Sequence, residues 1–271
     1  MAQTKNNRIL LAVVLLLLLV VILRTAWISD DAYISFRTVD NLVSGHGLTW
    51  NIAERVQAFT NPLWVILLSP FYALTGDIYF TSIFLSVFLT ILAAIFMARC
   101  YKGEPNSALL GLTILISSKA FIDYATSGLE NALGYAILGA FLFLYLTRKR
   151  STELLFILAI LASLGALNRL DTIVLYLPVL GLMVWYLPKK QGLKALAIGF
   201  APLILWELFS LWYYGFPFPN TYYAKLHTGI PAYDLFRQGF VYYLDSLTFD
   251  PLTLSVICGG LLLTLKRENK Q

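Results

Sequence analysis

Residues 9–28 read ILLAVVLLLLLVVILRTAWI, and the polar sequence Ser29-Asp30-Asp31 follows directly. A helix needs about 20 apolar residues to cross a bilayer, and this run, interrupted only by Arg24, has that length. It is too long for the apolar part of a secretory signal, and no small-x-small cleavage site follows it before Trp27. We therefore expect an uncleaved membrane anchor that ends at a pair of adjacent aspartates.

The composition of the whole chain favours the same class of protein. Of the 271 residues, 59% are hydrophobic and only 13% are charged, whereas soluble domains carry about 25% charge. This excludes an ordinary soluble domain and a disordered chain. Cys100 and Cys258 are the only cysteines, so a disulfide scaffold is excluded. The basic residues form short clusters between apolar runs, which is not a nucleic-acid-binding pattern.

The apolar runs predict an all-α, polytopic membrane helix bundle with about eight spans. Besides Ile9–Ile28, the predicted spans are Tyr79–Ala98, Ser107–Ile122, Asn131–Leu146, Leu154–Leu167, Thr172–Leu187, Leu193–Tyr213 and Pro251–Leu265. The run Pro62–Leu74 is left out because it is short and contains Pro70, and runs of 10–14 residues are more often interfacial or re-entrant than spanning.

The distribution of basic residues orients the bundle. With Pro62–Leu74 left out, thirteen Lys and Arg residues fall on one side and six on the other, and cytoplasmic loops carry the excess of basic residues. This places the protein in the cell membrane with both termini on the cytoplasmic side. Most acidic residues face outward, including Asp30, Asp31 and Glu130, and Glu207 is the one acid inside a span.

The two long outer loops, residues 29–78 and 214–250, are expected to form the site of a single module covering residues 1–271. Adjacent carboxylates such as Asp30 and Asp31 could bind a divalent cation, or one could act as a general base. Asp31 could also simply cap a predicted helix over Ala32–Val43. Arg169 and Asp171, at the mouth of two spans, indicate an ion pair or an anion site with a positioned base.

Several segments together resemble the GT-C membrane glycosyltransferases, in particular the actinobacterial terminal arabinofuranosyltransferase group. They are residues 30–37 (DDAYISFR), 45–48 (GHGL), 51–55 (NIAER), 60–64 (TNPLW), 126–130 (TSGLE), 169–171 (RLD) and 217–225 (PFPNTYYAK). Order and spacing both agree, and the match runs through most of the chain. The resemblance implies a bundle with a large first outer loop that carries juxtamembrane helices.

The resemblance also implies an activity. Such an enzyme moves a sugar from a polyprenyl-phosphate donor to a hydroxyl of an envelope glycan, lipid or protein on the outer face, and a single displacement inverts the anomeric centre. Asp30 or Asp31 would be the catalytic carboxylate, with a divalent cation as a further expectation. Residues expected at the donor phosphate or sugar are Arg169, Asp171, Lys225, Tyr223, Asn220, Glu130, Glu54, Arg55 and Asn61. The C-terminal extracytoplasmic domain of many relatives is not expected in this chain.

Two alternatives remain open at this point. Glu207 inside a span, with Pro202 near it, is a feature of transporters, although it could pair with a polar group of a neighbouring helix. An inactive accessory subunit of envelope polysaccharide assembly would bind the donor without turning it over.

Overall fold

The computed structural model describes residues 2–101, 103–226 and 229–268, without the side chains at 2–8, 225, 226 and 265–268. Every regular element in these ranges is a helix, which confirms the predicted all-α class. The helices are α1 (Ala2–Arg24), α2 (Ala32–Val43), α3 (Pro62–Thr75), α4 (Ile78–Cys100), α5 (Pro105–Ser117), α6 (Lys119–Asp123), α7 (Asn131–Thr147), α8 (Thr152–Asn168), the 3-10 turn η1 (Leu170–Thr172), α9 (Ile173–Tyr186), α10 (Lys189–Gly199), α11 (Ala201–Tyr214), α12 (Asn220–Leu226), α13 (Ala232–Phe249) and α14 (Pro251–Glu268).

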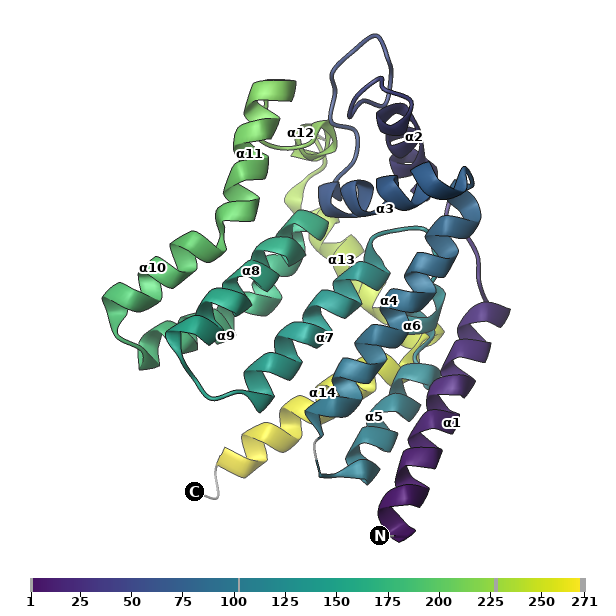
Figure 1. Ribbon diagram of the computed structural model, residues 1–271, viewed down its shortest axis with the longest axis vertical. Coiled ribbons are helices and arrows are strands. Elements are labelled where there is room, and N and C mark those ends of the chain that lie inside the picture. The colour runs from purple at the N-terminus through teal and green to yellow at the C-terminus, as the bar shows by residue number, and fades with distance from the viewer. Residues whose placement is uncertain (1, 102, 227–228, 269–271) are drawn as a thin grey trace.

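The long helices lie side by side in one bundle (Figure 1). Helix α4 packs along α7, α7 along α8, and α8 along both α9 and α10, while α1 packs on α4 and α5. Helix α3 crosses the bundle and, with α2 and α12, lies at one end of the molecule, whereas α1 begins and α14 ends at the opposite end (Figure 1). The first predicted outer loop and the α12 part of the second therefore lie at the same end, whereas α13 runs back along the bundle (Figure 1).

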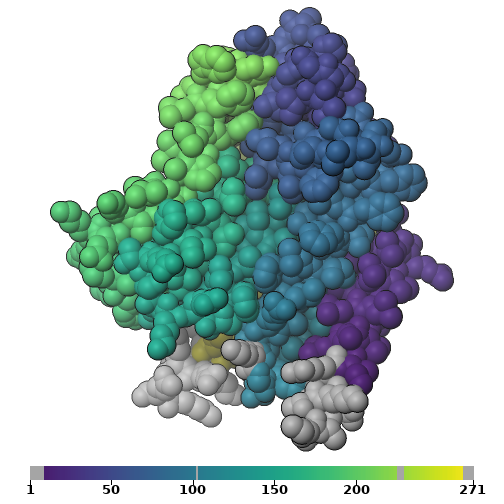
Figure 2. Space-filling view, viewed as in Figure 1, coloured from purple at the N-terminus to yellow at the C-terminus, as the bar shows by residue number. Residues whose placement is uncertain are grey.

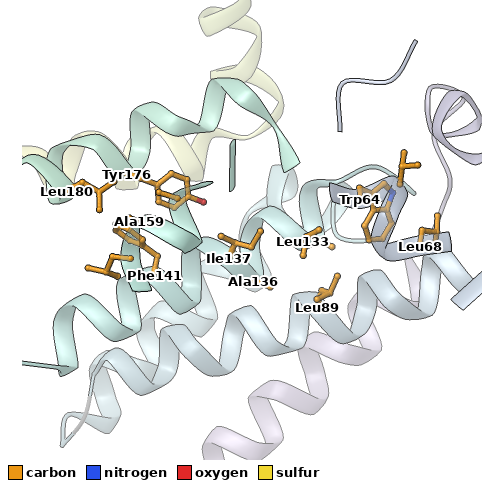
Figure 3. Close-up of a cluster of buried hydrophobic side chains, with 14 of the residues drawn as sticks. Trp64, Leu68, Leu89, Leu133, Ala136, Ile137, Phe141, Ala159, Tyr176 and Leu180 are labelled. Carbon is orange, nitrogen blue, oxygen red and sulfur yellow. The ribbon is translucent and has the colours of Figure 1, made fainter. Parts of the chain in front are cut away.

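The larger of two apolar cores ties that end to the bundle. It runs from Trp64 on α3, through Leu133 and Ile137 on α7, to Tyr176 and Leu180 on α9 (Figure 3). Trp64 has no exposed surface, and its indole N–H donates to the carbonyl of Gly128 at 3.0 Å. Because an indole N–H must find a partner when it is buried, this bond fixes the α6–α7 loop to α3.

Small residues allow the helices to approach closely. A Cβ added to Gly199 on α10 would lie 2.4 Å from the Cβ of Ala159 on α8, and one on Gly139 of α7 would lie 3.3 Å from the carbonyl oxygen of Ala93 on α4. Such small residues let apolar helices pack in close van der Waals contact.

Local sequence signals set several helix ends. The Asp77 carboxylate accepts from the Phe80 N–H at 3.0 Å and caps α4, and the Ser151 hydroxyl accepts from the Leu154 N–H at 3.0 Å and caps α8. Helix α3 ends at Gly76, whose φ of 69° is accessible to glycine at little cost. The predicted helix over Ala32–Val43 is confirmed with those bounds, with Ala32, Phe36 and Val39 on its buried face.

The expectation of eight clear spans is wrong for the described residues. By length and hydropathy, α4 alone suffices to cross a membrane, or up to three spans result if the bent pairs α10–α11 and α13–α14 each count as one. A continuous apolar run in the sequence does not show where a helix is interrupted. The run 107–122 breaks at Ser118, and the run 172–187 begins in the 3-10 turn η1. A 17-residue helix is only about 26 Å long, against about 30 Å of hydrocarbon.

Candidate active site

A cavity of about 730 Å³ opens between α2, the loop before α7, the end of α8 and α11. Asp31, Asn61, Glu130, Arg169 and Asp171, all expected site residues, line it. These residues come from four separate parts of the sequence, and the α11 segment meets the α2–α3 segment at this end of the molecule (Figure 2). The volume falls in the range of 300–1,000 Å³ that is usual for ligand sites.

The two adjacent aspartates have different environments. The Asp30 carboxylate accepts from the backbone N–H of Asp31 at 2.9 Å and from the Ser29 hydroxyl at 3.2 Å, and it lines a neighbouring cavity together with Arg37 and Asp40. Asp31 is the N-cap residue of α2, but its side chain makes no capping bond and, among the described residues, has no other hydrogen-bond partner. Its carboxylate lines the main cavity, so Asp31 is the member of the pair that is free to act there.

Arg169 is held between two other acids of the cavity. Its Nε donates to both carboxylate oxygens of Asp171, at 2.9 and 3.1 Å, and its Nη1 donates to Glu130 at 3.4 Å. The ion pair with Asp171 that the sequence suggested is thereby confirmed. The hydrogen bond to Asp171 raises the pKa of the Arg169 guanidinium, which stays charged, and its Nη2 makes no bond within the described part of the chain.

Glu130 connects Arg169 to the first outer loop. It is 6% exposed, and its second carboxylate oxygen accepts from the Asn61 amide at 2.8 Å. Asn61 in turn accepts from the Ser35 hydroxyl of α2 at 3.0 Å. Glu130 begins α7 but does not cap it with its side chain. A buried carboxylate needs such hydrogen bonds to offset desolvation, so this chain fixes Arg169 relative to α2.

The backbone around Gly128 sets the position of α2 next to the cavity. Gly128 has a φ of +77°, and an added Cβ would lie 2.9 Å from the Cβ of Ala32 and 3.0 Å from the Phe36 ring. The Ser29 N–H also donates to the carbonyl of Ser127 at 2.8 Å. Only glycine combines this backbone conformation with such a close approach, and the result is that α2 begins directly against the loop before α7.

Gln57 joins the first outer loop, residues 29–78, to α11 and α12. Its side-chain carbonyl accepts from the Ser210 hydroxyl of α11 at 3.0 Å, and its backbone carbonyl accepts from the Asn220 N–H at 3.0 Å. Gln57 and Phe218 line both the main cavity and a second cavity of about 330 Å³. The two cavities are therefore neighbours that share one wall.

The other expected site residues lie outside the main cavity. Arg55, Asn220 and Tyr223 line the second cavity, and the Arg55 guanidinium stacks 4.9 Å from the centre of the Tyr213 ring. Glu54 accepts from Asn51 at 2.6 Å and lines neither the main cavity, nor the second cavity, nor the one beside Asp30. The Lys225 side chain is outside the described residues, so its expected place beside Arg169 stays a prediction.

The described residues do not fit a divalent cation well. No group of three or more His, Cys, Asp or Glu side chains among them could hold a metal ion, and Asp30 and Asp31 line different cavities. A Mg²⁺ or Ca²⁺ site needs several oxygen ligands around one point. We therefore base no step of the mechanism on a cation.

Sequence reasoning missed several residues of the site. Gln57, Phe59, Trp206 and Thr221 line the cavity but carry no local signal of function. Glu207 also lines it and was noticed only as an acid inside a span. Its Oε2 has no hydrogen-bond partner among the described residues, so the expected pairing with a neighbouring helix is not formed at that atom. The signal that could have marked Glu207 as a site residue is that it is a single acid within an apolar run.

The fold and cavity define a helical protein with an apolar bundle and an acid-lined site at one end. The chain is 30% identical over 269 residues to the terminal β-(1→2)-arabinofuranosyltransferase of Mycobacterium tuberculosis, covering 89% of this chain and 42% of that protein. It is 26% identical over 227 residues to the terminal β-(1→2)-arabinofuranosyltransferase of Corynebacterium glutamicum, covering 73% of this chain and 33% of that protein. The chain therefore spans less than half the length of these relatives. No family model and no solved structure matches it.

Proposed function

We propose that this chain forms the membrane module of a glycosyltransferase that moves a sugar from a polyprenyl-phosphate donor to a hydroxyl acceptor on the extracytoplasmic face. The arabinofuranosyl group is the first candidate sugar, because it is what the names of both similar proteins specify. The observation that carries the proposal is the free carboxylate of Asp31 in one cavity with Arg169.

In the proposed reaction, Asp31 is the general base. The acceptor oxygen attacks the anomeric carbon of the donor sugar and gives its proton to the Asp31 carboxylate. The bond between that carbon and the phosphate oxygen breaks, and polyprenyl phosphate leaves with the electron pair. One displacement inverts the anomeric centre. A positioned base typically contributes about 10²–10⁴-fold to such a step.

Arg169 is proposed to contact the donor phosphate. It is the one cation among the described residues that line the cavity. Its Nε and Nη1 are directed at Asp171 and Glu130, which leaves Nη2 for a ligand. Negative charge grows on the leaving phosphate in the transition state, so a cation fixed in advance stabilises that state more than the ground state. The Glu130–Asn61 bond is what fixes it.

The transfer itself tests the proposal. Purified full-length protein in lipid nanodiscs is incubated with radiolabelled polyprenyl-phosphate arabinose and an envelope membrane extract, and label in the glycan fraction is counted. Transfer is expected from the wild type and lost in Asp31→Asn. The matched control is Asp234→Asn, since Asp234 is exposed on α13 and lines none of the three cavities.

The accessory-subunit alternative is decided by the same assay. A chain that binds the labelled donor but releases no product with any acceptor fraction is an accessory subunit, and that result would overturn the proposed activity. The transporter alternative rested on Glu207 inside a span, and Glu207 lines the same cavity as Asp31 and Arg169. This shared position favours a ligand site over a separate conduction path.

A further inference from the structure

Four acids line the main cavity, and Arg169 engages only two of them. Glu130 and Asp171 accept hydrogen bonds from its guanidinium. Asp31 and Glu207 do not, and the described residues contain no cation within ion-pair distance of either. Asp31 has the role of base in the proposed function, whereas Glu207 has no role there.

Two polar side chains that line the main cavity, Glu207 and Thr221, each carry an oxygen atom that no described residue satisfies. The Oε2 of Glu207 is buried, as is the hydroxyl oxygen of Thr221, and neither atom has a hydrogen-bond partner among the described residues. The two residues come from different helices, α11 and α12, and both line the main cavity. An unsatisfied buried polar group is costly. Of the six such oxygen atoms among the described residues, only these two belong to residues that line the main cavity, where a ligand can supply the missing partner.

The other residues that line the cavity indicate the chemistry of the ligand. Trp206 adjoins Glu207, and its ring lies 6.3 Å from that of Phe59, which is 2% exposed. Phe218 also lines the cavity. Aromatic rings offer an apolar surface, while a carboxylate and a hydroxyl offer hydrogen-bonding groups at its edge. A molecule with hydroxyl donors on a carbon ring fits this combination.

We propose that Glu207 and Thr221 hold hydroxyl groups of the transferred sugar, while Arg169 holds the phosphate of its carrier. This inference rests on the proposed function and assigns a sugar subsite to the α11–α12 wall of the same cavity. Glu207 is thus a sugar-binding residue, and Asp31 remains the base. This division predicts that Glu207 contributes to the binding of the sugar-loaded carrier only. Arg169 should contribute to the binding of the carrier with or without its sugar.

The test measures binding rather than turnover. Full-length wild type, Glu207→Gln, Thr221→Val and Arg169→Gln in nanodiscs are titrated with polyprenyl-phosphate arabinose and, separately, with polyprenyl phosphate without sugar. Glu207→Gln should lower the affinity for the sugar-loaded carrier about tenfold, which corresponds to about 1.4 kcal/mol, because a charge-assisted hydrogen bond becomes a neutral one. Thr221→Val should lower this affinity about threefold. Neither substitution should change the affinity for the carrier without sugar, whereas Arg169→Gln should lower the affinity for both forms of the carrier.

The outcomes separate this inference from the proposed activity. If Glu207→Gln loses affinity for the sugar-loaded carrier only, the subsite is supported, even when the wild type transfers no sugar. Absence of transfer would refute only the proposed activity. If the wild type transfers sugar but Glu207→Gln binds the loaded carrier normally, the subsite is wrong and the activity stands. Equal wild-type affinity for loaded and bare carrier would also overturn the subsite. Thermal unfolding of each variant verifies that it is folded, and Asp234→Asn is the control with unchanged binding.

Discussion

The two adjacent aspartates should respond very differently to replacement by asparagine. The Asp31 carboxylate makes no hydrogen bond among the described residues and lines the main cavity. Asp31→Asn should therefore lower transfer by about 10²–10⁴-fold, or about 3–5 kcal/mol in the activation barrier. Stability should change by less than about 0.5 kcal/mol, since no protein contact is lost.

Asp30→Asn supplies the matched comparison. The Asp30 oxygen that accepts from the Asp31 N–H and the Ser29 hydroxyl is retained in asparagine. Asp30 lines the neighbouring cavity rather than the main one. This variant should lose less than about 1 kcal/mol of stability, because both hydrogen bonds are kept, and it should retain most of its transfer activity.

Both variants are assayed in nanodiscs with radiolabelled donor at saturating concentration, so that the rate reports turnover rather than binding. Circular dichroism during heating verifies the fold. The reasoning is refuted if Asp31→Asn keeps more than about a tenth of wild-type turnover, since a general base contributes at least about 10²-fold. A greater loss in Asp30→Asn than in Asp31→Asn would refute it as well.

Three further predictions concern the frame of the site and are measured by unfolding in detergent. Asn61→Ala leaves a buried oxygen of Glu130 without its partner, so stability should fall by about 1–3 kcal/mol and transfer should fall with it. Gly128→Ala should cost about 1–3 kcal/mol, because the new methyl group would lie 2.9 Å from the Ala32 Cβ. Trp64→Phe should cost about 1 kcal/mol through the lost bond to the Gly128 carbonyl. Wild-type stability in any of the three contradicts the corresponding contact.

Much of the fold and part of the site could be predicted from the sequence. The helix over Ala32–Val43 and the Arg169–Asp171 pair were both anticipated, because helix periodicity and pairs two residues apart are local properties. The span count failed because hydropathy averages over Ser118 and the turn at Leu170–Thr172, where the backbone breaks. A break depends on how neighbouring helices pack, and a hydropathy window does not contain that information.

By itself the sequence determined the fold class, since its low charge and long apolar runs predict an all-helical protein. It also indicated where the site lies, because its acids gather in the predicted outer loops. Only the tertiary structure decided which acids share a cavity. It placed Asp31 and Asp30 in different cavities, and it placed Glu207 in the same cavity as Asp31, a residue 176 positions earlier in the chain. The physical reason is that one residue turns a side chain by about 100° around a helix, while packing between distant helices sets which surface that side chain meets.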